Sequence, residues 1–276
     1  GIDADVRFEG PGLTVAATRG RVLGTAIART KATMPDLVIE HPLLIVEGEA
    51  SGPTAEFLRF VETSPVAAWI DHATDGVQSA GNARLGLRLE MRPSQPEDRA
   101  RVGGELQLVD NQLRVPGLPA FTRVNGRLAF SERELNGRDV AFEAYGGPGR
   151  LTLSRRDGTT RVSGTGIANL AAFRNDVSGL PLERVSGTAD WRLDLTHRAG
   201  AASWSVDSNL RGASVDLPSP LRKSAAEAVA FRLERRPATG DAGRDTLIAQ
   251  YGEGVRVVAE RRTNGRDTTV ERALVL

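Results

Sequence analysis

The three histidines are the side chains best able to bind a metal or transfer protons, and they are scattered along the chain. His41, His72 and His197 form no HxxxH or HExxH pattern, the spacing that places metal-binding imidazoles on one face of a helix. Asp71 and Asp75 lie close to His72 and could hold a metal ion with it, but we favour a solvated helix terminus. We therefore expect neither a metal site nor a cofactor.

The sequence also offers no recognisable nucleophile. Cysteine is absent, which excludes thiol catalysis, disulfides and iron–sulfur clusters. No serine lies in a GxSxG motif, and Ser163 falls within 162–166, a strand that ends in a turn. Paired catalytic carboxylates need proximity in space, at roughly 5–10 Å, so a carbohydrate-active enzyme on a β scaffold stays open as an alternative. Our expectation is that the protein is not an enzyme.

Phosphate loops and nucleic-acid surfaces are disfavoured as well. The glycine-rich stretch 146–149 joins two alternating segments, which favours a hairpin or a bulge over a phosphate-binding loop. Nucleic-acid binding requires a basic surface, usually with stacking aromatics. Here 36 Lys and Arg nearly cancel 35 Asp and Glu, and aromatic residues make up 5% of the chain. We expect no nucleic-acid partner.

Alternation of apolar and polar residues with a period of two predicts the elements that must carry any site. In 82–91 the apolar residues are Ala83, Leu85, Leu87, Leu89 and Met91. Such a run places one face of a strand against apolar surroundings and the other in water. Similar runs recur, with hairpin signals such as Asp157-Gly158 and Asn264-Gly265. They predict a mainly β fold of about 16 antiparallel strands.

Helices are expected to be two or three in number and short. Pro53 and Glu56 begin an apolar stripe that predicts a helical pair or one kinked helix near 53–73. Asn169 is a candidate N-cap for a short helix over 170–174. Residues 222–229 have helical propensity but follow a Pro-rich loop, so helix and loop are equally compatible with them.

The chain is expected to be one continuous β-rich segment, residues 1–276, of a larger protein. It starts at Gly1 without Met and stops in the apolar-rich stretch 270–276. The polar, Pro-bearing loop 92–101 separates two possible sub-units, 1–92 and 102–276. No run approaches the roughly 20 apolar residues of a membrane-spanning helix.

The apolar strand faces allow two architectures. Two sheets can pack face to face around a closed core. Alternatively, one long antiparallel sheet curls into a groove or half-open barrel, because open sheets of more than about 10 strands tend to curl or split. Both architectures require the same alternation of apolar and polar residues along each strand. The large number of alternating strands, with little helix to cover them, favours the groove.

Three groups of residues resemble the AsmA-like YhdP family, in the order in which the family has them. They are 47–53 with Ser64-Pro65 and the strand 81–91, then 116–130 with the turn 145–148, and finally the loop 212–223 with its LP-x-PL-x-K pattern. The family's strand ending in Gly-Pro, its lGGp turn and its Pro-rich loop correspond to these stretches. The resemblance covers roughly residues 45–225.

The resemblance implies a large periplasmic protein that one N-terminal helix, outside this segment, anchors in the bacterial inner membrane. Such proteins are thought to form long β-grooves that carry phospholipid toward the outer membrane. The partners implied are phospholipid acyl chains and adjoining segments of the same parent chain, with membrane contact through parts outside this segment. No catalytic residues carry over, and the resemblance implies a loop at 222–229.

A groove has a physical rationale, because exposing acyl chains to water costs about 0.8 kcal/mol per CH₂. We expect the groove to be lined by apolar residues of the alternating strands, namely Leu85, Leu87, Leu89, Leu106, Leu108, Leu128, Phe130, Phe142, Leu151, Leu153, Trp191, Leu193, Leu195 and Trp204. The alternative function is a structural or protein-interaction β-module of the cell envelope. It would place many of these residues in a closed core and bind no lipid.

Overall fold

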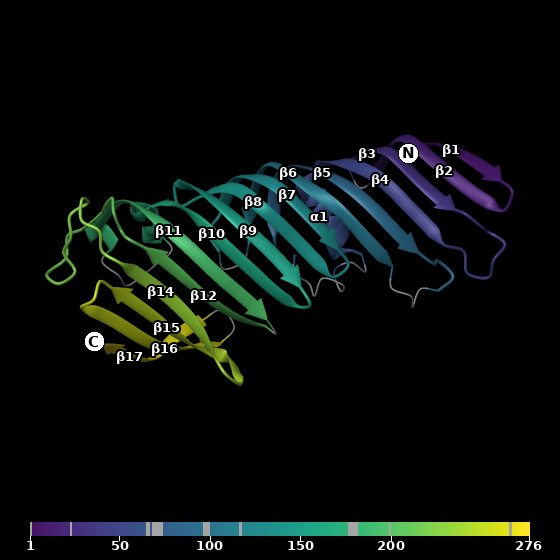
Figure 1. Ribbon diagram of the computed structural model, residues 1–276. Helices are drawn as coiled ribbons and strands as arrows, with labels where there is room; N and C mark the ends of the chain where they lie inside the picture. Colours follow the sequence, from purple (N-terminus) through teal and green to yellow (C-terminus); the bar gives the residue numbers. More distant parts are fainter. Residues whose placement is uncertain are drawn as a thin grey trace. The chain divides into compact units, whose positions relative to one another are not determined.

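A computed structural model describes residues 2–22, 24–64, 67, 74–95, 100–115, 118–175, 182–198, 200–264 and 267–276. The chain divides into two compact units, Gly1–Val140 and Ala141–Leu276. The 17 strands found among these described residues belong to one sheet, and Figure 1 shows how they follow one another. The mainly β, antiparallel class is therefore confirmed, with 17 strands where alternation predicts about 16. Among the described residues, no helix is both long and apolar enough to cross a membrane.

The N-terminal unit is built from strands that pair with their neighbours in sequence. The strands are β1 (Ile2–Glu9), β2 (Gly12–Val22), β3 (Thr25–Met34), β4 (Leu44–Pro53), β5 (Gln78–Met91), β6 (Arg101–Arg114) and β7 (Phe121–Ser131). Each consecutive pair from β1 to β7 is antiparallel. β8 (Glu134–Ala144) crosses the boundary between the two units. β5 ends at Met91 and β6 begins at Arg101, the last residue of the predicted loop 92–101, and the role of that loop as a sub-unit boundary stays a prediction.

An α-helix accompanies these strands. α1 (Thr54–Glu62) begins directly after Pro53 and packs against β4 and β5. Proline is well tolerated there because the first N–H groups of a helix have no partner within the helix. The helix expected near 53–73 is confirmed over this first part. Residues 65, 66 and 68–73, including His72, lie outside the described residues.

The C-terminal unit continues the same pattern with two short interruptions. Its elements are β9 (Gly147–Arg156), β10 (Thr159–Asn169), the 3₁₀ helices η1 (Leu170–Asn175) and η2 (Leu182–Arg184), β11 (Val185–Arg198), β12 (Ala201–Ser208), β13 (Ala213–Val215), β14 (Phe231–Ala238), β15 (Asp241–Tyr251), β16 (Val255–Asn264) and β17 (Asp267–Val275). β11 pairs with both β12 and β13, and β12 pairs with β14. β9, β10 and β11 pair in sequence order, and so do β14, β15, β16 and β17.

Local sequence explains the turns and the short helix of this unit. Asp157 and Gly158 have φ angles of 49° and 71°, as a tight two-residue hairpin requires, which confirms the predicted turn. Gly265, in the second predicted hairpin, lies outside the described residues. Asn169 Oδ1 accepts a hydrogen bond from Ala171 N at 3.0 Å, so the predicted cap is confirmed at the start of η1.

The stretch 222–229 is a loop rather than a helix, as the resemblance implies. Lys223 is 3% exposed, and its Nζ donates hydrogen bonds to the carbonyls of Leu210, at 2.8 Å, Ser224, at 2.9 Å, and Ala213. Burial lowers the pKa of this amine, against the opposing effect of Glu227. A lysine that satisfies carbonyls from several turns at once fixes the loop in a non-helical path.

β-bulges bend two adjacent strands of the N-terminal unit. The register shifts at Gly81 in β5 and at Asp110 in β6. Gly81 has φ of +120°, and a Cβ there would lie 2.8 Å from Asn111 Cα, so only glycine fits. Asn111 is 0% exposed and donates to Asn82 O at 2.8 Å and Val109 O at 3.1 Å. Bulges bend a strand and increase its twist, so β5 and β6 curve here.

Candidate functional site

In the N-terminal unit, strand register brings the predicted lining residues onto one face. Residues directly opposite each other in an antiparallel pair project from the same side of the sheet. The rows across β5, β6 and β7 are Leu85 with Leu106 and Leu128, Leu87 with Gly104 and Phe130, and Ala83 with Leu108 and Gly126. Leu89 continues the face opposite Val46 and Val102. The predicted residues of this unit therefore form a contiguous apolar surface.

The C-terminal unit has an apolar face of the same kind. Its rows are Leu153 with Val162, Leu195 and Trp204, then Leu151 with Gly164, Leu193 and Val206. Leu233, Ala249 and Val257 extend the second row across β14, β15 and β16. The rings of Phe142 and Trp191 lie next to each other on this face, with centroids 6.3 Å apart. Strand register and this ring contact thus group all the predicted residues of this unit, while their role in lipid binding stays a prediction.

Aromatic rings on these faces lie over glycines of neighbouring strands. A Cβ at Gly149 would lie 2.5 Å from Phe142 Cζ, and one at Gly166 would lie 2.6 Å from Trp191 Cζ2. Aromatic side chains that cover a strand glycine protect its backbone and help to fix register. The rings therefore lie along the sheet rather than standing up from it.

The apolar faces are covered only in part. Of the predicted lining residues, Leu108 and Phe142 are each 6% exposed, and the others are half-buried. Among the described residues, Asn111 is the largest side chain that is less than 2% exposed. A closed β-sandwich fully buries the residues between its sheets. The described residues therefore show little of the dense core that such a sandwich would have.

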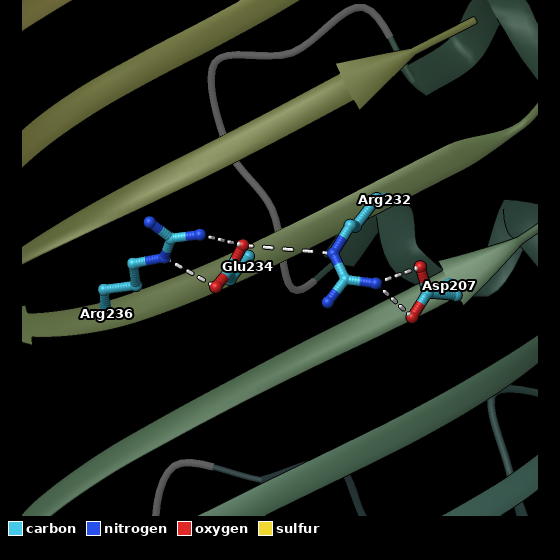
Figure 2. A network of polar contacts seen from close by, with 4 residues as sticks. All are labelled: Asp207, Arg232, Glu234 and Arg236. Carbon is cyan, nitrogen blue, oxygen red and sulfur yellow. Dashed lines mark hydrogen bonds and ion pairs between the residues drawn. The ribbon is translucent and has the colours of Figure 1, made fainter.

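The opposite face of the sheet is polar and held by ion pairs. Figure 2 shows Arg232 between Asp207 and Glu234, with Arg236 on the other side of Glu234. Arg232 Nη1 lies 2.7 Å from Asp207 Oδ1, and Arg236 Nε lies 2.6 Å from Glu234 Oε1. The hydrogen bond from Arg236 lowers the pKa of Glu234, against the opposing effect of burial. Opposite charges in adjacent strands favour this register over a slipped one.

The described candidates for metal binding and catalysis, His41, Ser163 and His197, lie on different elements of the fold. His41 Nδ1 lies 3.3 Å from Ser94 Oγ, and His197 lies on β11 opposite Thr160. Within the ranges that the structure describes, no group of three or more His, Asp or Glu residues could hold a metal ion. Ser163 pairs with Thr152 and Asp194 inside the sheet. Gly146 forms a turn with Tyr145, and Gly147 begins β9, as the hairpin interpretation of 146–149 predicts.

Sequence reasoning missed a charged cluster on the apolar face of the C-terminal unit. Arg235 Nε and Arg261 Nε each lie 2.8 Å from the carboxylate of Asp245, which is 5% exposed. Register places Arg235 opposite Trp204 and Leu247, so it projects from the apolar side. The signal was present in the sequence, because alternation from Phe231 and Leu233 reaches Arg235.

Fold and surface together define a class of protein: an antiparallel sheet of many sequential strands, with one apolar face, one ion-paired face and little dense core among the described residues. The model of the YhdP protein family matches residues 1–275, and the chain belongs to that family.

The chain is similar to the intermembrane phospholipid transporter YhdP of Escherichia coli (strain K12), with 23% identity over 261 residues. The match covers 88% of this chain and 20% of the relative, so the chain spans about a fifth of that protein's length. No solved structure matches the chain.

Proposed function

We propose that this chain is a segment of a periplasmic protein, anchored in the inner membrane, that carries phospholipid between the two membranes along its apolar β-face. The observation that carries the proposal is the half-burial of leucines that register aligns into rows, such as Leu85, Leu106 and Leu128. A surface of this kind offers contact to acyl chains without specific polar ligands. The name of the Escherichia coli relative supports the same substrate class.

The energetics favour such a surface. Moving an acyl chain of about 14 CH₂ groups from apolar surroundings into water costs roughly 11 kcal/mol. Apolar rows that run from strand to strand provide continuous cover for such a chain within each unit. Membrane contact and the adjoining segments of the parent chain would complete the path at its ends.

A protein-interaction module with a closed core is the competing function. It requires the leucine rows to be sealed by another layer of protein. Half-buried leucines and small buried residues, chiefly alanines, support the lipid-binding proposal over this alternative.

The test is mass spectrometry of an organic extract of the purified chain, beside a size-matched control β-protein. We expect near-stoichiometric phospholipid with this chain alone. Leu87→Glu adds a charge to the apolar face and should abolish lipid loading while the urea unfolding midpoint changes little. Gln107→Glu is the matched control, because Gln107 lies on the polar face opposite Arg84 and Arg127, and it should load lipid normally.

Two results would contradict the proposal. The first is an extract with no more phospholipid than the control protein. The second is gross unfolding of Leu87→Glu with a folded Gln107→Glu, which would indicate that Leu87 packs in a closed core.

A further inference from the structure

The cluster of Arg235, Asp245 and Arg261 has an excess of positive charge. One carboxylate faces two guanidinium groups, so the cluster carries one surplus positive charge on the apolar face. About a quarter of each arginine side chain is exposed, at 25% and 23%, against 4% for the Asp245 side chain. A net charge on a largely desolvated surface is costly unless a counter-charge accompanies it.

The hydrogen bonds within the cluster leave donors for such a counter-charge. Asp245 accepts from Arg235 Nε through Oδ2 and from Arg261 Nε through Oδ1. Arg235 Nη1 also donates to Ala202 O at 3.0 Å. A guanidinium has five N–H donors in a planar fork, and within the described residues the Nη groups of Arg261 and Nη2 of Arg235 have no partner. These are the donors that match the oxygens of a phosphate ester.

The position of the cluster relates it to the apolar rows. Arg235 lies opposite Trp204, and Trp204 lies opposite Leu195, both of them predicted lining residues. In the adjoining row, Thr160 lies opposite Arg155 and His197 rather than opposite apolar residues. The cluster therefore lies where the apolar face of the C-terminal unit gives way to polar side chains, which is the arrangement that an amphipathic ligand would fit.

We propose that Arg235, Asp245 and Arg261 form an anion site that binds the phosphate ester of a lipid headgroup while the acyl chains lie on the neighbouring apolar rows. The lipid part of this inference rests on the proposed function. Asp245 holds the two guanidinium groups in place, and a monoanionic phosphodiester balances the surplus charge. A free phosphate would be recognised by the same donors.

The test compares three ligands by isothermal titration calorimetry with the 276-residue chain: dihexanoyl phosphatidylglycerol, dihexanoylglycerol without a phosphate, and inorganic phosphate. Arg261→Gln removes the surplus charge and leaves Asp245 paired with Arg235. We expect it to weaken phosphatidylglycerol binding about tenfold and to leave dihexanoylglycerol binding unchanged. Arg236→Gln is the control, because it removes one positive charge from the polar face of β14, the strand that carries Arg235 (Figure 2), and it should change neither affinity.

Arg261→Lys is a second variant that keeps the charge beside Asp245 but loses the planar fork, and it decides the question if Arg261→Gln does not fold. A loss of several-fold in phosphatidylglycerol affinity is expected. Unchanged phosphatidylglycerol affinity in both folded variants would overturn the site while leaving the lipid-carrying proposal intact.

If the unsubstituted chain binds neither lipid, the proposed function fails separately. Inorganic phosphate binding that Arg261→Gln weakens would then identify a site for a free anion. Phosphate binding that the substitution leaves unchanged, or the absence of phosphate binding, would overturn the inference.

Discussion

Trp191 lies across Gly166 of the neighbouring strand so closely that a methyl group on Gly166 would come within 2.6 Å of the indole ring. The two residues are directly paired in β11 and β10. The ring therefore occupies the place where a side chain of β10 would stand, and a large aromatic residue adds little height to the apolar face. Phe142 over Gly149 repeats the arrangement.

Replacing Gly166 by alanine should displace Trp191. The same methyl group would also lie 2.6 Å from Pro148 O, so both a ring and a backbone must shift, at a cost of roughly 1–3 kcal/mol in unfolding free energy. Urea unfolding and tryptophan fluorescence measure this. Gly86→Ala is the control, because nothing lies within 4 Å of a Cβ there, and it should change stability by less than about 0.5 kcal/mol. Equal effects of the two variants would refute the close approach.

Substitutions at Leu106 and Leu108 distinguish an open apolar face from a closed core. Leu108 is 6% exposed and Leu106 is half-buried. Leu108→Ala should therefore cost about 2–3 kcal/mol, and Leu106→Ala about 1 kcal/mol, in unfolding free energy. Denaturant titration of the two variants gives both values. A loss at Leu106 as large as that at Leu108 would mean that another layer of protein covers the leucine row.

Lys223 should stabilise the loop that follows β13. Lys223→Met leaves buried carbonyls without their donor, which should cost roughly 1–3 kcal/mol and expose the loop to protease. Arg222→Met is the matched control, because Arg222 is exposed and pairs only with exposed Asp216 among the described residues. Limited proteolysis with identification of the cut site measures the effect. Equal resistance of both variants would rule out this role for Lys223.

Acid should weaken the C-terminal unit through Asp245. Burial alone would raise the pKa of this carboxyl, but hydrogen bonds from Arg261 and Arg235 outweigh that effect and hold the pKa below its ordinary value. The unfolded chain then takes up the proton first, so the stability that Asp245 contributes is present above about pH 4 and is lost as pH falls through the folded pKa.

The measurement for this prediction is the urea midpoint at pH 7 and at pH 3. Asp245→Asn should be less stable than the unsubstituted chain at pH 7, because two arginines lose their counter-charge, and its midpoint should fall less between the two pH values. An identical fall in both proteins would show that other groups account for the acid sensitivity.

Local pattern was enough to predict most of the secondary structure. The alternation in 82–91 identifies β5, and the turn at Asp157 and Gly158 fixes the β9–β10 hairpin. Pro53 and Asn169 mark helix starts because capping depends on a few adjacent residues. Each of these features depends on a few adjacent residues, so it can be predicted from a single sequence.

The features that the sequence did not predict depend on contacts between residues that lie far apart in the chain or on different strands. Asp245 meets Arg235 and Arg261 only once β14, β15 and β16 align, and the residue types do not specify that alignment. The sequence places Lys223 in the loop with the LP-x-PL-x-K pattern, but its burial depends on the carbonyls of Leu210 and Ala213. The bulge at Gly81 likewise becomes apparent only beside Asn111.

Pairing between sequence neighbours also bears on how the sheet folds and how its length can change. Most hydrogen bonds between strands close short loops, which favours rapid folding from any hairpin outward. Insertion or loss of one whole hairpin leaves the side chains of all the remaining strands on the same faces of the sheet. Each hairpin added would lengthen the apolar surface by about 10 Å, two strand spacings. Duplication of hairpins is thus a simple evolutionary route by which the length of such an apolar surface can change.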